Sequence, residues 1–527
     1  MGAIGKARSP GRTAPRATRA RALAQGRRCP GATSWRCYGR QRGAVPIILS
    51  PRAGAAARGG PAPGRYFTFC RRHALTRIAP STRSPRTQLR SLPAALLGLL
   101  ACSLAQAGGF QLLEQNASGI GNAYAGSAAV ADNASTIFFN PAGMTELRDR
   151  EISLGGSLVD LSAEFTDRGS LTGPSSTLRG NGGDAGSTAL VPNAYLSWRL
   201  SPQLWAGIGI SAPFGLKTEY DDQWVGAAQA LSFEVKTINI NPSLAFKVND
   251  TLSVGAGVSY QKLDADYVRN ISALGRPAAP LPLSTSTVRF KADDWSWGWN
   301  VGVLFKPSPD TRLGVSYRSA IKHSVAGNLR TSAPAPFGPA VEGIGDSDAY
   351  ARIKLPETLI LSAVQRVNPQ WEVLGDVSWT RWNSIQDVLI MRTTSVATPR
   401  PGRSEDLAGG TAQTLEARFR NSWRVAVGAN YNLNSAWTLK GGLAFDRTPV
   451  RGPETTLVSL PDANRTWLAV GAQWRPSADG RVDFGLTRIL IKDADINNNQ
   501  VAAGRGRVTG TYDSKLWVFG VQYSHAF

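Results

Sequence analysis

Cysteine is absent from most of this 527-residue chain. The four cysteines that occur all lie before residue 108: Cys29, Cys37, Cys70 and Cys102. The 420 residues after position 107 therefore cannot form a disulfide, a thiolate metal site or a cysteine nucleophile. Histidine is also scarce there, because only His323 and His525 remain. We therefore expect no metal site, no cofactor and no catalytic residue.

Acidic residues are absent from the first 107 positions, which contain Lys6 and 19 arginines; the first acid is Glu114. The rest of the chain is nearly neutral, with 39 basic and 37 acidic residues, so the net charge of +22 belongs to the N-terminal region. Residues 1–88 have a composition that does not fold compactly. We interpret them as a basic extension from a start codon assigned too early. A nucleic-acid-binding arm or a transit peptide is the alternative, and no nucleic-acid partner is expected.

Long hydrophobic runs are also missing, since no segment after residue 150 contains 18 consecutive apolar residues. Residues 89–107, LRSLPAALLGLLACSLAQA, have an apolar core that is too short to cross a bilayer as a helix. The core follows Arg90 and ends at Ala105-Gln106-Ala107, a small-x-small cleavage site. We predict a secretory signal peptide cut after Ala107. A lipoprotein signal around Cys102 is the alternative.

What the chain does contain is alternation of apolar and polar residues. Residues 251–261, TLSVGAGVSYQ, place Leu252, Val254 and Tyr260 on one face and small polar residues on the other. Residues 516–527, LWVFGVQYSHAF, alternate in the same way up to the terminal Phe527. A period of two with one apolar face is typical of β-strands.

The connections between these segments alternate between short and long. Short turn-like clusters occur at 201–202, 248–250, 307–310, 368–369, 432–435 and 476–480. Longer Gly-, Pro-, Ser- and Thr-rich connections occur at 167–187, 214–232, 270–287, 332–350, 394–413, 449–463 and 496–509. Thirteen connections separate fourteen strands, and this arrangement is typical of outer-membrane barrels.

We therefore predict an all-β fold, a 14-stranded antiparallel transmembrane β-barrel formed by residues 150–527. Tryptophans such as Trp198 and Trp205, beside the first short turn, and Trp371 fit the aromatic belts at the membrane interfaces. A soluble β-sandwich or propeller is the alternative. Such folds rarely sustain this alternation, and a secreted sandwich more often carries disulfides.

Residues 108–149 precede the first strand and lack its period of two. They contain STIFFNPAGMTEL, in which Pro141 ends an apolar run because it has no N–H and disfavours a helical Asn140. Asn140 can also cap a new helical turn that has Pro141 in its first position. A fourteen-stranded barrel is wider than its own side chains can fill. We predict that residues 108–149 form a hatch, a plug inside the barrel lumen.

The sequence GGFQLLEQNASGIGNAYAGSAAVADNASTIFFNPAGMTEL resembles the N-terminal hatch of the long-chain fatty acid transporters of the bacterial outer membrane. That family also includes aromatic-hydrocarbon uptake channels. The stretches PFGLKTEYDDQWVG, LPETLILSAVQRVNPQWEVLGDVSWTRW, DRTPV and LPDANRTW resemble the family too. The resemblance covers the whole chain after residue 107. It implies an outer-membrane location in a Gram-negative cell, passive uptake of a hydrophobic compound, and no enzyme activity.

The resemblance also implies site residues. Asn140, Pro141 and Ala142 would form the hatch motif. Phe110, Leu112, Phe138 and Phe139 would line the ligand pocket. Phe214, Leu216 and Trp224 would form part of an extracellular capture surface, although an ordinary interface belt is equally consistent with them. Release would follow a shift of the hatch and lead through a gap in the barrel wall into the membrane.

A fatty acid also carries a carboxylate, which a basic residue on an inward-facing strand position would bind. The candidates are Lys236, Arg318, Arg381, Arg418 and Arg424. Monoaromatic hydrocarbons and alkanes are alternative substrates, and a general hydrophilic porin is a weaker alternative. The expected partners are the hydrophobic ligand, outer-membrane lipid and the barrel-assembly machinery that reads the Phe527 end. We expect a monomer.

Overall fold

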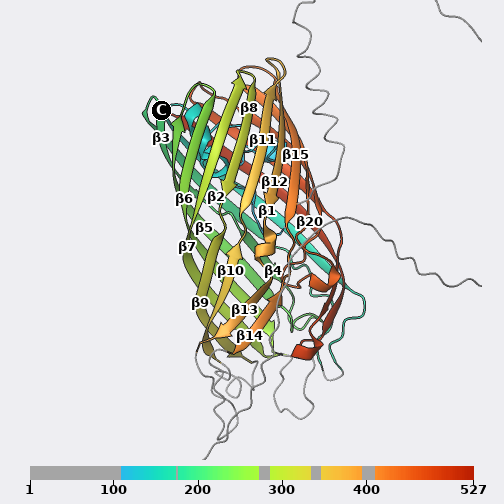
Figure 1. Cartoon of the computed structure of the whole chain (residues 1–527). Helices are drawn as coiled ribbons and strands as arrows, with labels where there is room; N and C mark the ends of the chain where they lie inside the picture. Colours follow the sequence, from blue (N-terminus) through green and yellow to red (C-terminus); the bar gives the residue numbers. More distant parts are fainter. Residues whose placement is uncertain (1–108, 174–175, 272–284, 334–345, 394–409) are drawn as a thin grey trace, which may run out of the picture. The chain divides into compact units, whose positions relative to one another are not determined.

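The structure is a computed structural model, and it describes residues 109–173, 176–271, 285–333, 346–393 and 410–527 (Figure 1). The predicted extension at 1–88 and signal peptide at 89–107 lie outside the described residues. Among the described residues, no helix is both long enough and apolar enough to cross a membrane.

A closed antiparallel β-barrel of fourteen strands forms most of the described chain, which confirms the predicted fold. Eight barrel strands are continuous: β1 (Arg150–Asp167), β2 (Thr188–Ser201), β5 (Ser232–Lys247), β6 (Leu252–Asn270), β7 (Thr287–Ser308), β16 (Trp437–Asp446), β17 (Arg465–Trp474) and β20 (Arg507–Ala526). The barrel closes because β1 pairs with both β2 and β20.

Six barrel strands are interrupted and therefore carry two labels each. They are β3 (Leu204–Ser211) with β4 (Gly215–Glu219), β8 (Thr311–Arg318) with β9 (Ile321–Ser332), β10 (Ser347–Leu355) with β11 (Thr358–Arg366), β12 (Trp371–Thr380) with β13 (Asp387–Arg392), β14 (Thr411–Glu416) with β15 (Ser422–Asn432), and β18 (Gly480–Ile491) with β19 (Ala494–Asn499). The alternation of apolar and polar residues does not predict these interruptions.

The short and long connections lie at opposite ends of the barrel, as the alternation predicted (Figure 1). The six short turns follow strands β2, β5, β7, β11, β15 and β17. Several boundaries were wrong, because parts of the expected loops form strand: 215–219 in β4, 347–350 in β10, 411–413 in β14 and 496–499 in β19. In outer-membrane barrels the longer loops are extracellular, so the long-loop end is the extracellular end here.

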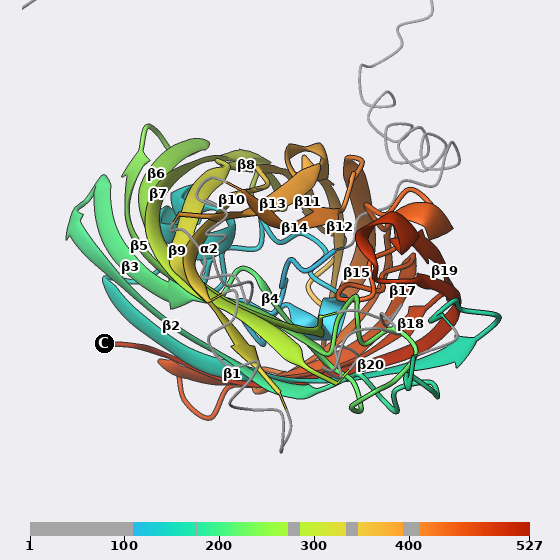
Figure 2. The same cartoon turned by 90° about the horizontal axis from the view of Figure 1, so that it is seen from below.

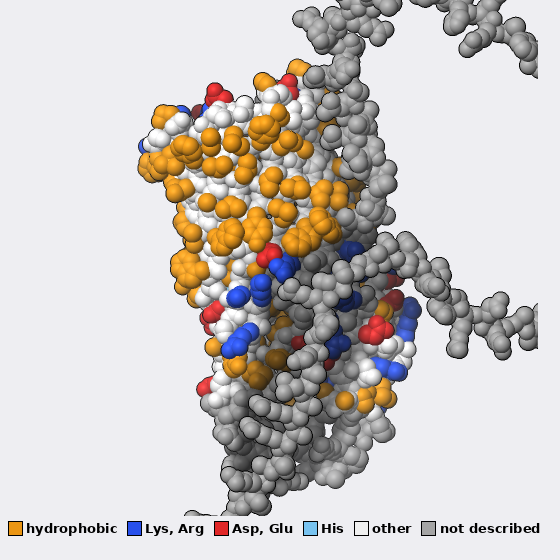
Figure 3. All heavy atoms as spheres, viewed as in Figure 1, with side chains coloured by type: hydrophobic (Ala, Val, Ile, Leu, Met, Phe, Trp, Pro, Cys, Tyr) orange, Lys and Arg blue, Asp and Glu red, His pale blue; other side chains and the backbone are white. Residues whose placement is uncertain are grey.

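The outer surface carries an apolar belt near the short-turn end (Figure 3). Large side chains there are well exposed, for example Trp297 at 65 % and Trp299 at 50 %. Trp198 and Trp371 are also exposed, but Trp205 faces the interior and is buried. The strand alternation puts buried polar residues such as Ser153 on the inner face.

Residues 109–149 lie inside the barrel and are mostly buried (Figure 2). They form three short elements, η2 (Ile120–Asn122), α2 (Thr136–Phe139) and η3 (Pro141–Glu146). Their backbone comes very close to the wall. A Cβ on Gly442 of β16 would lie 2.2 Å from the Asn122 carbonyl carbon, and one on Gly121 would lie 2.7 Å from the Cα of Gly471. Glycine at these positions therefore allows the segment to fit.

Candidate functional site

Asn140 and Pro141 form a capped break in the inner segment. α2 ends at Phe139, and η3 begins at Pro141 with Asn140 as its N-cap. The Ala142 N–H donates to Asn140 Oδ1 at 3.1 Å, which confirms the predicted cap. Asn140 Nδ2 donates to the Ala128 carbonyl at 2.6 Å and to the Val303 carbonyl of β7 at 2.9 Å. One side chain therefore joins two parts of the segment to the barrel wall.

Five basic side chains of the wall donate hydrogen bonds to backbone carbonyls of residues 109–147. The pairs are Arg312 with Val130, Arg318 with Phe138, Arg424 with Ala123, Lys440 with Ser118, and Arg465 with Gly109. We call these five residues the basic clamps. Their charges are balanced in part by buried acids, as in the Lys440–Asp483 pair at 2.8 Å.

This arrangement revises the predicted carboxylate partners. Arg318 and Arg424 do face the lumen, but both bind the inner segment. Arg381 and Arg418 do not face it, and Lys236 lines a cavity of about 310 Å³ beside the break between β3 and β4. Lys236 is exposed on β5 and lies 3.7 Å from Glu234, Arg381 pairs with Glu357 at 3.0 Å, and Arg418 pairs with Glu416 at 2.6 Å. The structure therefore places Arg381 and Arg418 in ion pairs outside the lumen, whereas a carboxylate-binding role of Lys236 stays a prediction.

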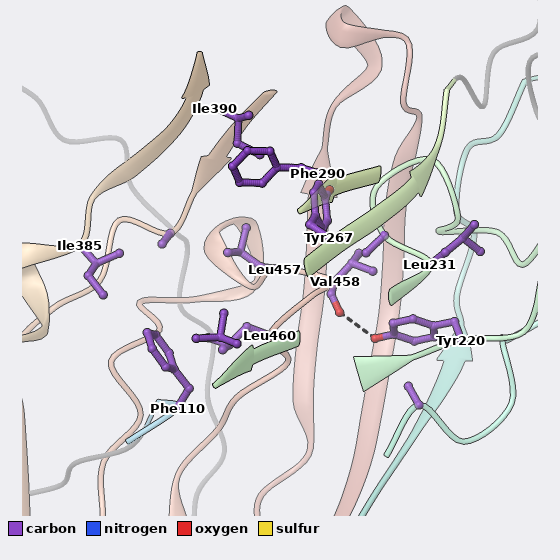
Figure 4. Packing of buried hydrophobic residues seen from close by; sticks show 14 of the residues in the cluster. Phe110, Tyr220, Leu231, Tyr267, Phe290, Ile385, Ile390, Leu457, Val458 and Leu460 are labelled. Atoms are coloured by element: carbon purple, nitrogen blue, oxygen red, sulfur yellow. Dashed lines mark hydrogen bonds between the residues drawn. The ribbon is translucent and has the colours of Figure 1, made fainter. Parts of the chain in front are cut away.

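An apolar cavity of about 80 Å³ lies inside the extracellular half of the barrel (Figure 4). Its walls come from β5, β6, β7, β9, β10, β13 and β14 and from the connection between β16 and β17. The lining includes Phe110, Val235, Leu263, Tyr267, Phe290, Val325, Ile385, Ile390, Phe419, Leu457 and Leu460. Phe110, at the start of the described chain, packs against Phe214 and Trp382 with ring centroids 5.8 and 5.1 Å apart.

A second cavity of about 310 Å³ adjoins the interruption between β3 and β4, at Ala212 and Pro213. Phe110 and Leu112 line it together with Leu190, Val191 and Leu216. β3 pairs with β2 and with β5, whereas β4 pairs, among the described residues, with β5 alone. The wall therefore lacks a strand-to-strand ladder between β4 and residues 188–193 of β2. Phe110 lines both cavities.

A hydrogen-bond network around Asp462 holds the N-terminal end of the described chain. Gly109 N–H donates to Asp462 Oδ2 at 2.9 Å, and Arg465 donates both to the Gly109 carbonyl at 2.9 Å and to Asp462 Oδ1 at 2.6 Å. Thr448 Oγ1 also donates to Asp462, at 2.7 Å. Asp462 and Thr448 lie in the connection between β16 and β17, which also supplies Leu457 and Leu460 to the apolar cavity.

The other predicted ligand-contact residues lie elsewhere. Phe138 and Phe139 line a different, partly polar cavity of about 50 Å³ with Arg318, Asp376 and Arg424. Trp224 is buried at 1 % exposure against Phe165 and Tyr220, and Phe214 is buried beside Phe110. Phe214 and Trp224 are therefore not open to solvent, and Phe214 lines the second cavity, so their role in capture stays a prediction. Leu216 lies on β4, beside the second cavity.

The connection between β4 and β5 is fixed by buried polar contacts. Tyr220 Oη donates to the Val458 carbonyl at 2.7 Å (Figure 4), and Trp224 Nε1 donates to the Ala230 carbonyl at 3.0 Å. Burial raises the pKa of the Tyr220 hydroxyl well above its usual range. Tyr220 therefore remains a neutral donor, and it ties this connection to the β16–β17 connection.

A group of basic residues that the sequence analysis missed lies at the extracellular end of the apolar cavity. Tyr267 lines that cavity, Gln413 Nε2 donates to Tyr267 Oη at 3.3 Å, and Arg269 Nε donates to Gln413 Oε1 at 2.7 Å. Arg505 Nη2 donates to the carbonyl of Ala412, the neighbour of Gln413, at 3.5 Å. Continuing the alternation of residues 251–261 along β6 would have placed Arg269 on the inner face.

Comparison with known proteins identifies the family. Residues 98–527 match the outer membrane protein transport protein family (OMPP1/FadL/TodX). The chain belongs to this family. It is 31 % identical over 426 residues to outer membrane protein P1 of Haemophilus influenzae, covering 75 % of this chain and 88 % of that protein. It is 26 % identical over 473 residues to the long-chain fatty acid transport protein of Escherichia coli K12, covering 84 % and 100 %.

Solved structures of the OMPP1/FadL/TodX family share the fold. The crystal structure of a Pseudomonas aeruginosa FadL homologue matches with a TM-score of 0.69 and 25 % identity, covering 79 % of this chain and 99 % of that chain. The Pseudomonas putida toluene transporter TodX matches with a TM-score of 0.58 and 17 % identity, covering 80 % and 100 %. This chain is therefore an outer-membrane transport barrel, and its family consists of transporters and channels rather than enzymes.

Proposed function

We propose that this protein takes up long-chain fatty acids, or closely related hydrophobic compounds, passively across the outer membrane. The observation that carries the proposal is the apolar cavity inside the barrel, which Phe110 of the inner segment helps to line. Each CH₂ group moved from water into such a cavity contributes about 0.8 kcal/mol. An acyl chain is therefore retained there, whereas a hydrated solute gains nothing.

The basic group beside the cavity favours an acid over a neutral hydrocarbon. Arg269 reaches Tyr267 through Gln413, and its Nη1 donates to the backbone carbonyls of Asn270 at 2.8 Å and Ile271 at 3.2 Å. A carboxylate entering beside Tyr267 could replace these neutral acceptors with a charge-assisted hydrogen bond. The long-chain fatty acid transport protein of E. coli K12, a relative, supports this choice.

The small volume of the apolar cavity, about 80 Å³, favours a second candidate, a monoaromatic hydrocarbon. A long acyl chain needs more room, and the neighbouring cavity of about 310 Å³ provides it. Because Phe110 lines both cavities, a long ligand would occupy them together after the Phe110 ring moves aside. The toluene transporter TodX of P. putida supports the second candidate only through its fold.

For release, we propose that residues 108–149 act as a hatch and that the ligand leaves sideways into the membrane. The second cavity adjoins the interrupted strand at Ala212 and Pro213, where β4 lacks pairing to β2 among the described residues. An exit there keeps the acyl chain out of water. Entry would begin at the extracellular loops. The hatch would start at Gly108 after cleavage behind Ala107, and N-terminal sequencing of the outer-membrane protein tests that start.

Binding measurements on the purified barrel test the substrate. We expect oleate to bind and toluene to bind more weakly, and we expect Arg269→Gln to weaken oleate binding about tenfold without changing toluene binding. Arg330→Gln, which removes an exposed, ion-paired charge that lines neither cavity, is the matched control. Equal loss of oleate binding in both variants would contradict the role of Arg269. Tighter binding of toluene than of oleate would favour the second candidate.

A further inference from the structure

Three basic side chains lie together on the outer surface of the barrel, on β9 and β10. Lys322 and Lys354 are directly opposite each other in the antiparallel pairing of these strands, and Arg352 occupies the next outward position of β10, opposite Ser324. Directly opposite residues have Cβ atoms roughly 4.5–5.5 Å apart, and like charges in such a pair are destabilising. The free protein therefore carries a local repulsion that a bound anion would relieve.

Neighbouring cations of the same outer surface are paired with acids. Examples are Lys262 with Asp264 at 2.7 Å, Arg330 with Asp346 at 3.4 Å, and Arg381 with Glu357 at 3.0 Å. Among the described residues, no carboxylate lies within ion-pair distance of Lys322, Arg352 or Lys354. Arg352 instead lies over the Tyr350 ring, 5.3 Å from its centroid.

The position of the three cations relative to the membrane is well defined. Ser296 Oγ donates to the Lys322 carbonyl at 2.6 Å, so Lys322 lies beside the part of β7 that carries the exposed rings of Trp295 and Trp297. β9 begins one residue before Lys322 and runs away from the apolar belt toward the long connections. Basic side chains gather directly beyond the belt in this view (Figure 3). This height corresponds to the headgroups of the outer leaflet.

We propose that Lys322, Arg352 and Lys354 bind the phosphate groups of a lipid with a phosphorylated sugar headgroup in the outer leaflet. An arginine can bind phosphate through two parallel hydrogen bonds, and two lysines add point charges on the same oxygens. The lipid's acyl chains would lie along the apolar belt next to Trp297, which keeps its phosphates at the height of the three cations. The site faces outward and is separate from the proposed uptake route.

Native mass spectrometry of the full processed barrel in detergent tests this site, with bis-phosphorylated lipid A as the probe. The test variant is Lys322→Gln/Arg352→Gln/Lys354→Gln. The control variant, Lys262→Gln/Arg330→Gln/Arg381→Gln, removes the same number of charges from ion-paired positions. We expect the test variant to lose lipid A affinity about tenfold or more and the control to change less than about twofold.

Two further arms identify the ligand chemistry. We expect dephosphorylated lipid A to bind the unmodified protein as weakly as lipid A binds the test variant, and we expect inorganic phosphate alone not to bind. Equal affinity of both lipids, equal loss in both variants, or saturable binding of inorganic phosphate at the three residues would each overturn the proposal. The single variant Lys354→Gln removes the opposed charge pair, so its thermal unfolding midpoint without lipid should not fall, and a fall would contradict the inferred repulsion.

Discussion

The tip and the body of the inner segment are held in different ways. The tip, residues 109–116, contacts two cavities and is held by Asp462 and Arg465. The body, residues 117–147, is packed against glycines of the wall and bound by four of the five basic clamps. The body adjoins small cavities of about 50 and 30 Å³, whereas the tip adjoins the cavity of about 310 Å³, and a more closely packed interface resists displacement. A tip beside unfilled volume can move when a ligand competes for that volume, so the two parts can serve stability and transport separately.

The largest expected effect comes from breaking a clamp of the body. Lys440 and Asp483 have side-chain exposures of 5 % and 1 %, so Lys440→Met leaves a buried carboxylate without its cation. We expect a loss of about 3–5 kcal/mol in the free energy of unfolding. Urea unfolding of the purified barrel measures it. Restoring stability with Lys440→Met/Asp483→Asn would support the charge explanation, and an unchanged Lys440→Met variant would refute it.

Overpacking the body against the wall should have the next largest effect. A Cβ on Gly442 would meet the Asn122 backbone at 2.2 Å, whereas one on the adjacent Gly441 would meet nothing within 4 Å. We expect Gly442→Val to destabilise the barrel by about 1–3 kcal/mol and Gly441→Val to have little effect. Heat-modifiable migration on a denaturing gel compares the two. Similar behaviour of both variants would show that the body does not press on this strand.

Changing the tip should affect binding rather than assembly. Phe110→Ala removes a ring that lines both cavities and contacts Phe214 and Trp382. We expect oleate affinity to fall about tenfold while outer-membrane abundance stays normal. Uptake of labelled oleate, in a strain that lacks its own transporter, checks this prediction. Phe214→Ala is the comparison variant. If Phe110→Ala is absent from the outer membrane while Phe214→Ala is present at normal abundance, the Phe110 ring is needed for folding rather than for binding.

The smallest expected effect comes from the capped break at Asn140 and Pro141, which follows the four clamped carbonyls of the body. Asn140→Ala removes the cap on Ala142 and the bonds to the Ala128 and Val303 carbonyls. We expect a loss of about 1 kcal/mol, a folded barrel and altered uptake of hydrophobic substrate. Pro141→Ala frees the backbone at the same place and should alter uptake in the same direction. Unchanged uptake in both variants at normal abundance would mean that the segment only fills space.

The strands of this protein could be predicted from its sequence because a half-buried strand has a period of two. The segments at 251–261 and 516–527 show that period, and they form parts of β6 and β20. The alternation of short and long turns could also be predicted, because turns are marked by local clusters of turn-forming residues. The cap at Asn140 was also predictable, because it involves residues two positions apart.

The interruptions and the partners of the charged residues were not predictable in this way. Period two assigns a residue to a face only while the strand continues, and the break between β14 and β15 puts Arg418 outside. Arg318 and Arg424 face the lumen as predicted, yet their partners are carbonyls of a segment 180 and 301 residues away in the chain. Alternation in the sequence therefore determined the barrel and its inner face, whereas only the closed tertiary structure decided which lumen cations hold the inner segment and which remain beside the cavity, because such contacts depend on distances across the barrel that no local pattern contains.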